Sequence, residues 1–128
     1  MKEYDIFGTK IDDYLLGLIL TDDMMTHKIQ KIEKNTIFYS WINEYDDKEV
    51  DETMTVYEFA FKCVYFLMRR GYRVAISSTH TKFGERHYLN LWYENRIESK
   101  HGYRDELPDT IIESCVAYIK NNEGNKNE

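Results

Sequence analysis

Hydrophobic positions recur at helical spacing near the start of this chain. Between Thr9 and Leu20 the apolar residues lie three or four positions apart, which predicts an amphipathic helix. The predicted apolar face consists of Ile11, Tyr14, Leu15, Leu18 and Ile19. We expect Thr9 to be the N-cap, with Asp12 and Asp13 in the first turn, where the helix dipole favours acidic side chains.

Two later segments have the same spacing together with start and stop signals. Thr55 and Glu58 have the spacing of a capping box, and Gly71 is the expected C-terminal stop. The buried face of this second helix is predicted to be Val56, Phe59, Ala60, Cys63, Phe66 and Leu67. A third helix is predicted to open near Pro108, because a proline lacks only an N–H that the first turn leaves unused. Its apolar face is predicted to be Ile111, Ile112, Cys115, Tyr118 and Ile119.

Between the first two helices, β-branched and aromatic residues favour a hairpin. Lys34-Asn35 is placed to turn the chain between Lys28–Glu33 and Thr36–Ile42. Residues 46–52, which contain five acidic side chains, are expected to form an acidic loop.

After the second helix, polar and apolar residues alternate with the period of a strand. Tyr72–Thr79 and His87–Glu94 are predicted to pair around a polar turn at Thr81–Arg86. Residues 95–103 are expected to form a polar loop or a short third strand. These elements together predict an α+β fold, with a small antiparallel sheet of three to five strands packed with three helices.

Length and composition limit the number of domains. A chain of 128 residues with 42% hydrophobic residues can build one core, so we expect a single domain over residues 1–121. Residues 122–128 contain no apolar side chain and are predicted to be a disordered polar tail. No apolar run approaches the roughly 18–20 residues of a membrane-spanning helix.

Charge is unevenly distributed, although the net charge is −6. Residues 1–57 carry six lysines against thirteen acidic residues, whereas residues 58–104 carry nine basic residues against four acidic ones. The basic middle could form a local anion-binding patch. Alternatively, the charged segments are solvated faces that mix when the chain folds.

The first candidate site lies in and near the hairpin of the basic middle. The candidate ligand-binding residues are Arg69, Arg73, His80, Lys82, Arg86 and His87. Guanidinium groups suit phosphates, and Phe83, Tyr88 or Trp92 could stack a base, so a nucleotide or single-stranded nucleic acid would fit. The alternative is a solvated polar turn, because no glycine-rich phosphate loop accompanies these residues.

A second basic group precedes the last helix. It consists of Arg96, Lys100, His101 and Arg104. An anion could lie between this group and the free amides at the helix start. Asp105, Glu106 and Asp109 would repel it there.

Aromatic residues exceed what a small core can bury. The chain contains eleven Tyr, six Phe and two Trp. The candidate protein-interface residues are Tyr39, Trp41, Tyr45, Tyr88 and Trp92. Self-association, a protein partner or ordinary partial exposure would each account for the surplus.

Motifs for catalysis and metal binding are missing from the sequence. It contains no CxxC, HExxH or calcium-loop pattern, and Ser114-Cys115 lacks the glycines of a nucleophile elbow. We therefore predict no catalytic residue, no metal and no cofactor. Cys63 and Cys115 are expected to be buried structural residues, because free cysteine behaves as a small hydrophobe. Their contact with each other is left open.

The order of these elements resembles the phage ABA-sandwich domain family over residues 9–120. The resemblance is carried by Ile11–Leu15, Trp41, Thr55–Phe59, Gly71–Val74, Leu91–Tyr93 and Leu107–Ile112. The long polar turn and the acidic, alanine-poor last helix depart from the family pattern. The resemblance implies an α+β fold and an origin in a bacteriophage or prophage. It implies no activity and no functional residue.

The sequence as a whole favours a non-enzymatic phage or prophage accessory protein that acts by binding. Its target would be a host defence or regulatory protein in the bacterial cytoplasm, a location that two unpaired cysteines also favour. One alternative is a binder that sequesters a small anionic nucleotide. Another is an acidic decoy of a DNA-binding surface, formed by residues 44–52 and the first helix. We expect a possible homo-oligomer, no membrane association and no nucleic-acid partner.

Overall fold

A computed structural model describes residues 2–20, 25–43, 45–93, 96–101 and 107–122 of the chain. Its backbone divides into two compact units, Met1–Lys62 and Cys63–Glu128. The boundary falls inside one helix, α2 (Val56–Arg69). The single domain expected over residues 1–121 remains a prediction.

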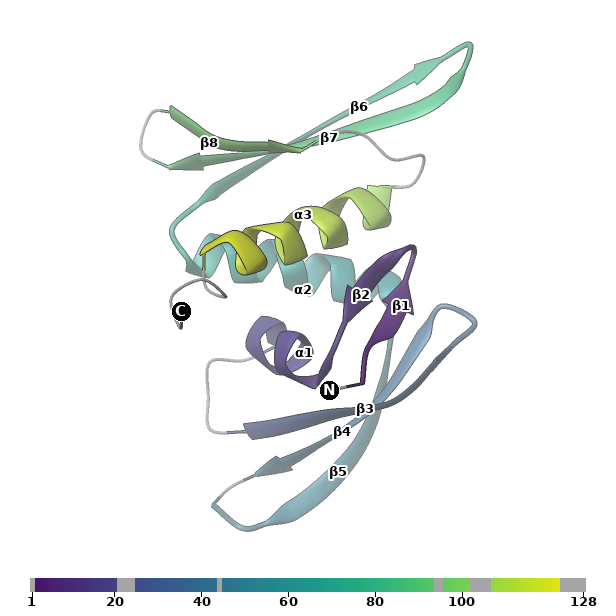
Figure 1. The fold of residues 1–128 in the computed structure, drawn as a ribbon, viewed down its shortest axis with the longest axis vertical. Coiled ribbons are helices and arrows are strands. Elements are labelled where there is room, and N and C mark those ends of the chain that lie inside the picture. Colours follow the sequence, from purple (N-terminus) through teal and green to yellow (C-terminus); the bar gives the residue numbers. More distant parts are fainter. Residues whose placement is uncertain (1, 21–24, 44, 94–95, 102–106, 123–128) are drawn as a thin grey trace. The chain divides into compact units, whose positions relative to one another are not determined.

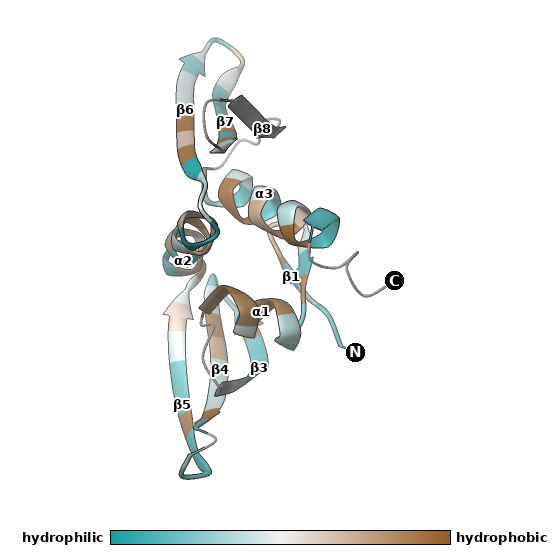
Figure 2. Ribbon diagram, turned by 90° about the vertical axis from the view of Figure 1, so that its left-hand side faces the viewer, coloured by the Kyte–Doolittle hydropathy of each residue, from teal (hydrophilic) through white to brown (hydrophobic). Residues whose placement is uncertain are grey.

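The first unit begins with a short hairpin and a helix and continues into a three-stranded antiparallel sheet (Figure 1). Its elements are β1 (Tyr4–Ile6), β2 (Thr9–Ile11), α1 (Asp13–Leu20), β3 (Met25–Glu33), β4 (Thr36–Asn43) and β5 (Lys48–Thr55). The strand order of the larger sheet is β3-β4-β5. Helix α1 is predominantly hydrophobic (Figure 2), and Leu15, Leu16 and Ile19 are buried.

The start of α1 corrects the sequence prediction. Thr9 belongs to β2, where it pairs with Ile6, and is not the N-cap. Asp12 is the cap: its Oδ1 accepts a hydrogen bond of 2.9 Å from the Leu15 amide, and its carbonyl accepts one from the Leu16 amide. Ile11 is buried, but it belongs to strand β2. Its helical spacing from Tyr14 and Leu15 therefore does not reflect a shared helix.

The β3–β4 turn confirms the hairpin predicted at Lys34-Asn35. Both residues have positive φ, 51° and 64°, as a two-residue type I′ turn requires. The acidic loop predicted for residues 46–52 is partly wrong. Asp46 and Asp47 lie in the turn before Lys48. Glu49, Asp51 and Glu52 lie in β5, which pairs with β4 without a register shift. Acidic side chains have low strand propensity, and the ladder to β4 overrides it.

Helix α2 begins and ends as predicted. The Thr55 Oγ1 accepts a hydrogen bond of 3.0 Å from the Glu58 amide, and the Glu58 carboxylate accepts one from the Thr55 amide in return. At the other end Gly71 has a φ of 93°, and the Tyr72 amide donates to the Leu67 carbonyl. This left-handed position terminates the helix as a Schellman-type cap.

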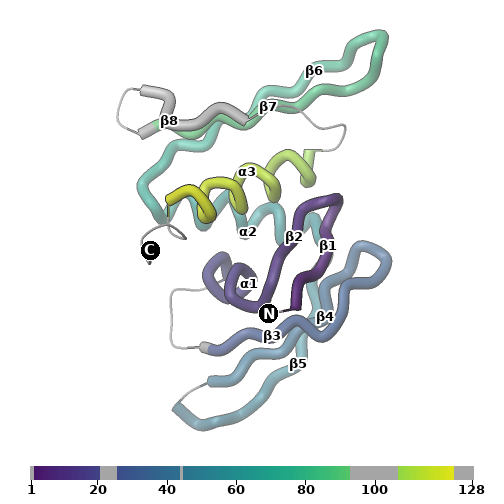
Figure 3. The backbone as a smooth tube through the Cα atoms, in the orientation of Figure 1, coloured from purple at the N-terminus to yellow at the C-terminus, as the bar shows by residue number. Residues whose placement is uncertain are grey.

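The second unit packs a helix on a three-stranded antiparallel sheet. Its elements are β6 (Arg73–Thr81), β7 (Gly84–Tyr93), β8 (Arg96–His101) and α3 (Leu107–Asn122), with strand order β6-β7-β8. Helix α3 runs along the sheet and contacts β7, and the tip of the β6–β7 hairpin extends past its end (Figure 3). The third strand offered for residues 95–103 is therefore present as β8.

The β6–β7 turn is tighter than predicted. Thr81 pairs directly with Gly84, so the turn consists of Lys82 and Phe83 and does not extend to Arg86. Gly84 has a φ of 114°, which only glycine adopts without strain. The Thr81 hydroxyl accepts a hydrogen bond from the Phe83 amide and donates one to the Gly84 carbonyl.

The predicted fold class is confirmed. Within the described residues the chain is α+β, with three helices and antiparallel sheets. The strands are distributed over three small sheets because each hairpin pairs locally. Pro108 lies in the first turn of α3, as predicted. Asn122 is the last residue of α3, and its Nδ2 donates a hydrogen bond to the Tyr118 carbonyl. Residues 123–128 of the predicted tail lie outside the described residues.

We predict that Asp12→Ala lowers the free energy of unfolding by about 1 kcal/mol, because it removes the N-cap of α1. Thr9→Ala is the matched control and should cost less, because the Thr9 hydroxyl caps no helix. Urea unfolding followed by circular dichroism measures both changes. A larger loss for Thr9→Ala than for Asp12→Ala would contradict the cap assignment.

Candidate functional site

Helix α2 is apolar on two opposite faces. One face carries the predicted buried residues Val56, Phe59, Ala60, Cys63, Phe66 and Leu67, all of which are buried. The other carries four large side chains that remain exposed: Tyr57 at 47%, Phe61 at 65%, Tyr65 at 54% and Met68 at 54%. Their spacing of four, four and three residues places them in one line along a helix. We call these four residues the α2 stripe.

Charged residues accompany the α2 stripe on the same helix. Glu58 is engaged in the cap at the first turn, while Lys62 and Arg69 are exposed further along. The Arg70 guanidinium lies over the Phe66 ring, 4.5 Å from its centroid. The exposed charge beside the middle and the C-terminal end of the stripe is therefore positive.

The predicted basic site divides between two faces of the β6–β7 hairpin. Directly paired residues of antiparallel strands share a face, and successive residues alternate. Arg73 pairs with Trp92 and Arg86 with Thr79, so both arginines lie on one face but roughly 20 Å apart along the strands. His87, paired with Ser78, and His80, paired with Glu85, lie on the opposite face.

The remaining members of the predicted basic site are also separated. His87 is 6% exposed, with its Nδ1 2.8 Å from the Ser78 hydroxyl and its Nε2 3.3 Å from the Glu85 carboxylate. It therefore stabilises the hairpin from within. Lys82 lies at the turn, its Nζ 5.1 Å from the centroid of the Phe83 ring, and Arg69 belongs to α2. The structure does not bring the six residues together.

The side chains of the second basic group, Arg96, Lys100, His101 and Arg104, lie outside the described part of the structure. The backbone of Arg96–His101 forms β8, and Arg104 lies outside the described residues. The anion site suggested there stays a prediction.

Among the predicted interface residues, Tyr39 is almost fully buried. It is 7% exposed because it faces the core side of β4, and its hydroxyl donates a 2.8 Å hydrogen bond to the Glu52 carboxylate. Tyr45 is 85% exposed, while Trp41, Tyr88 and Trp92 are half-buried.

Sequence reasoning missed most of the exposed apolar surface. The exposed large hydrophobic residues also include Phe83, Ile76 and Tyr14 in addition to the α2 stripe. The 57-61-65-68 spacing was visible in the sequence as a second helical face. A helix that is apolar all round is expected to be covered on both sides, so the exposure itself carried no sequence signal.

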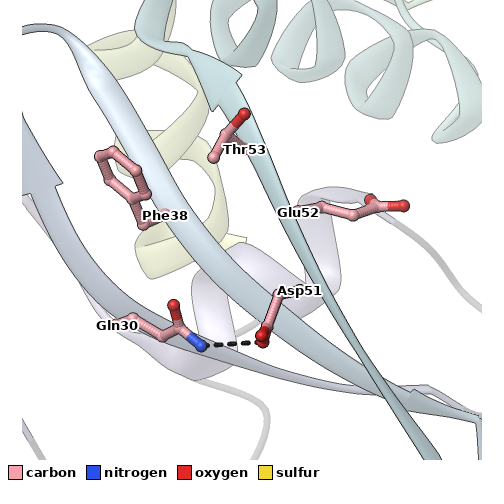
Figure 4. Close-up of a pocket in the computed structure, with 5 residues that line it drawn as sticks. All are labelled: Gln30, Phe38, Asp51, Glu52 and Thr53. Carbon is pink, nitrogen blue, oxygen red and sulfur yellow. Dashed lines mark hydrogen bonds between the residues drawn. The ribbon is translucent and has the colours of Figure 1, made fainter.

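A shallow hollow of about 380 Å³ lies on the β3–β4–β5 sheet (Figure 4). It is lined by Gln30, Phe38, Asp51, Glu52 and Thr53. The Gln30 Nε2 donates a 3.0 Å hydrogen bond to the Asp51 Oδ1, and the Lys31 Nζ lies 4.7 Å from the centroid of the Phe38 ring. Two of the polar groups that line it, Gln30 and Asp51, are thus already engaged with each other.

The two cysteines are buried and unoxidised, and they contact each other. Burial, followed by the hydrogen bond with Cys115, raises the pKa of the Cys63 thiol well above its ordinary value. The structure therefore resolves the contact that the sequence left open. Among the described residues, His, Cys, Asp and Glu side chains nowhere gather in the groups of three that a metal ion needs.

Comparison with known proteins gives no match: no protein-family model fits the chain, and neither curated proteins nor solved structures contain a similar one. The described helices include none with the length and apolar character needed to cross a membrane.

The pKa of Tyr39 generates a prediction on pH dependence. Burial, followed by the hydrogen bond to Glu52, raises this pKa well above its ordinary value. The folded chain then keeps the proton when the unfolded chain has lost it. The stabilising contribution of Tyr39 is complete below pH about 10 and is lost as the pH rises through the raised pKa.

We therefore expect the unfolding free energy to fall above pH about 10, and to fall less steeply in Tyr39→Phe. Ultraviolet titration of tyrosinate should show one late-ionising tyrosine that this variant lacks. If both proteins lose stability equally over this range, the Tyr39–Glu52 hydrogen bond does not exist in solution.

The cysteine pair generates a prediction on reactivity. Neither Cys63 nor Cys115 should react with an aromatic disulfide reagent in the native protein, because buried thiols with a raised pKa are inert. Both should react at once in guanidinium chloride. Rapid labelling of the native protein would contradict the burial of this pair.

Proposed function

We propose that this chain is a non-enzymatic phage or prophage accessory protein, and that it binds a host regulatory or defence protein in the bacterial cytoplasm. The observation that supports the proposal is the α2 stripe, Tyr57, Phe61, Tyr65 and Met68. Scattered apolar residues are ordinary on a protein surface, whereas contiguous exposed patches mark interaction sites.

The α2 stripe can supply useful binding energy. Each side chain is about half exposed, so covering it contributes roughly 1 kcal/mol, about half the value for complete burial. Four such contributions, about 4 kcal/mol, correspond to roughly a thousandfold in Kd. Tyrosine also offers a large contact area for little rotamer entropy, which suits it to an interface.

The spacing of the α2 stripe indicates the chemistry of the partner. Anchors at i, i+4, i+8 and i+11 of one helix fit an apolar groove that receives a helix. Lys62 and Arg69 are the exposed charges alongside, so the rim of that groove should be acidic where it meets the C-terminal half of α2. The target is therefore a protein with a helix-binding groove. Its host origin rests on the family resemblance.

The two alternative functions make different use of the molecule. Sequestration of a small nucleotide needs the six basic residues in one place, and the hairpin separates them. An acidic decoy would use β5 and the turn before it, where Asp46, Asp47, Glu49 and Asp51 are exposed. Binding by these carboxylates would weaken steeply with salt, whereas binding by the α2 stripe, with only Lys62 and Arg69 beside an acidic rim, would weaken much less.

We predict that Phe61→Asp lowers affinity for the captured host protein at least about 100-fold, because it removes an anchor and buries an unpaired charge. The partner is first captured from host lysate and identified, and its Kd is then measured with purified components. Tyr45→Asp is the matched control, since Tyr45 is more exposed and lies outside the α2 stripe.

Circular dichroism verifies that both variants are folded. Affinity that survives Phe61→Asp but falls on Asp51→Lys, or that falls more than tenfold on raising the salt, would contradict the role of the α2 stripe and favour the decoy.

A further inference from the structure

The β6–β7 hairpin presents a continuous line of aromatic and polar side chains on one face. Strand register puts Trp92, Asn90, Tyr88 and Arg86 of β7 on the same face, opposite Arg73, Ala75, Ser77 and Thr79 of β6 respectively. We call these eight residues the hairpin track. It is independent of α2 and of the binding function proposed above.

The other face of the hairpin is covered along part of β7, whereas Ile76, Ser78 and His80 of β6 on that face are exposed. Leu89 and Leu91 are each 1% exposed, and α3 contacts β7. Because side chains alternate along a strand, the hairpin track points away from this core. On the track, Ser77, Thr79 and Arg73 are exposed, and Tyr88 and Trp92 keep part of their surface in solvent.

Small side chains lie opposite three of the four β7 positions of the track. The partners of Asn90, Tyr88 and Arg86 on β6 are the small residues Ala75, Ser77 and Thr79. Tyr88 and Trp92 are four residues apart, roughly 13 Å, so two separate bases can stack on them.

Charge along the track is positive in an acidic chain. The track carries Arg73 and Arg86 and no carboxylate, because Glu85 lies on the opposite face of the hairpin. The Arg73 guanidinium lies 5.3 Å from the centroid of the Trp92 ring, a planar cation stacked on an aromatic. Arg86 is at the other end of the track, and Lys82 lies beyond it at the hairpin turn.

A polar group in the middle of the track lacks a partner. Within the described part of the chain, the Asn90 Oδ1 is buried and makes no hydrogen bond. Asn90 lies between Tyr88 and Trp92 on β7, at the place where a base edge would pass. Because this oxygen is closed to solvent, a hydrogen bond to an exocyclic amino group requires the Asn90 side chain to turn outward.

We propose that the hairpin track binds single-stranded nucleic acid, with Trp92 and Tyr88 stacking bases and Arg73 and Arg86 contacting phosphates. The sequence alone did not favour a nucleic-acid partner. The register of β6 and β7 supports such a partner, because it places the two aromatic rings and both arginines on one face of the hairpin. The track is roughly 20 Å long from Trp92 to Arg86, the span of a few nucleotides.

The test uses the two tryptophans as separate reporters. In Trp41→Phe the only tryptophan is Trp92, on the track. In the matched control Trp92→Phe the only tryptophan is Trp41, on the β3–β4–β5 sheet. Each protein is titrated with single strands of roughly 12 nucleotides, oligo(dT) and oligo(U), which distinguish DNA from RNA. A duplex of the same length and thymidine monophosphate complete the set.

We expect saturable quenching of Trp92 by at least one of the single strands and no quenching of Trp41. The duplex and the mononucleotide should quench far more weakly. Arg73→Glu, made in the Trp41→Phe protein, should weaken binding by about tenfold or more. Two phosphate contacts, by Arg73 and Arg86, predict that affinity also falls about fivefold between 50 and 150 mM salt.

Four results would overturn the proposal, three of which concern the titrations of the single-tryptophan proteins. These are the absence of saturable quenching at 50 mM salt, equal quenching of Trp41 and Trp92, and a mononucleotide that binds as tightly as a strand. A fourth is unchanged affinity in Arg73→Glu. Because Arg73 is exposed, that variant keeps the protein folded, as circular dichroism verifies, and loss of binding then reports on the track.

Discussion

Burial of one face of α2 is the interaction on which the most distinctive surface of this protein depends. Phe59, Cys63, Phe66 and Leu67 are completely buried, so the rotation of the helix about its own axis is fixed. The reciprocal Thr55–Glu58 cap and the left-handed Gly71 fix where the helix begins and ends. Once these are set, the 3.6-residue repeat leaves Tyr57, Phe61, Tyr65 and Met68 on the outside. Their exposure therefore follows from packing on the opposite side.

Elements with local signals were predicted correctly from the sequence. The α2 cap, the Lys34-Asn35 turn and the position of Pro108 each depend on residues a few positions apart. Errors occurred where distant pairing decides the outcome. The acidic residues of β5 form a strand because β4 provides a ladder, and Thr9 is drawn into β2 by pairing with Ile6. In both places tertiary context overrides local propensity.

The candidate surfaces were harder to predict for a related reason. Clustering in the sequence suggested that Arg73, Arg86 and His87 form one site, but strand parity places His87 on the buried face. The same parity brings Trp92 and Tyr88 onto the face of the two arginines, a grouping that sequence proximity obscures. Tyr39, chosen for an interface, is instead held in the core by its hydrogen bond to Glu52. Register and burial, rather than residue type, therefore decide which surfaces are available to a partner.

The most direct test is hydroxyl-radical footprinting of the purified protein, which reports the solvent exposure of individual side chains. We expect heavy oxidation of Phe61, Tyr65 and Met68, with Phe59 and Phe66 of the same helix protected. Because both sets lie on one helix, unfolding or fraying of α2 would raise the two together. Protection of Phe61, Tyr65 and Met68 to the level of Phe59 and Phe66 would contradict an exposed apolar face on α2, and with it the proposed binding surface.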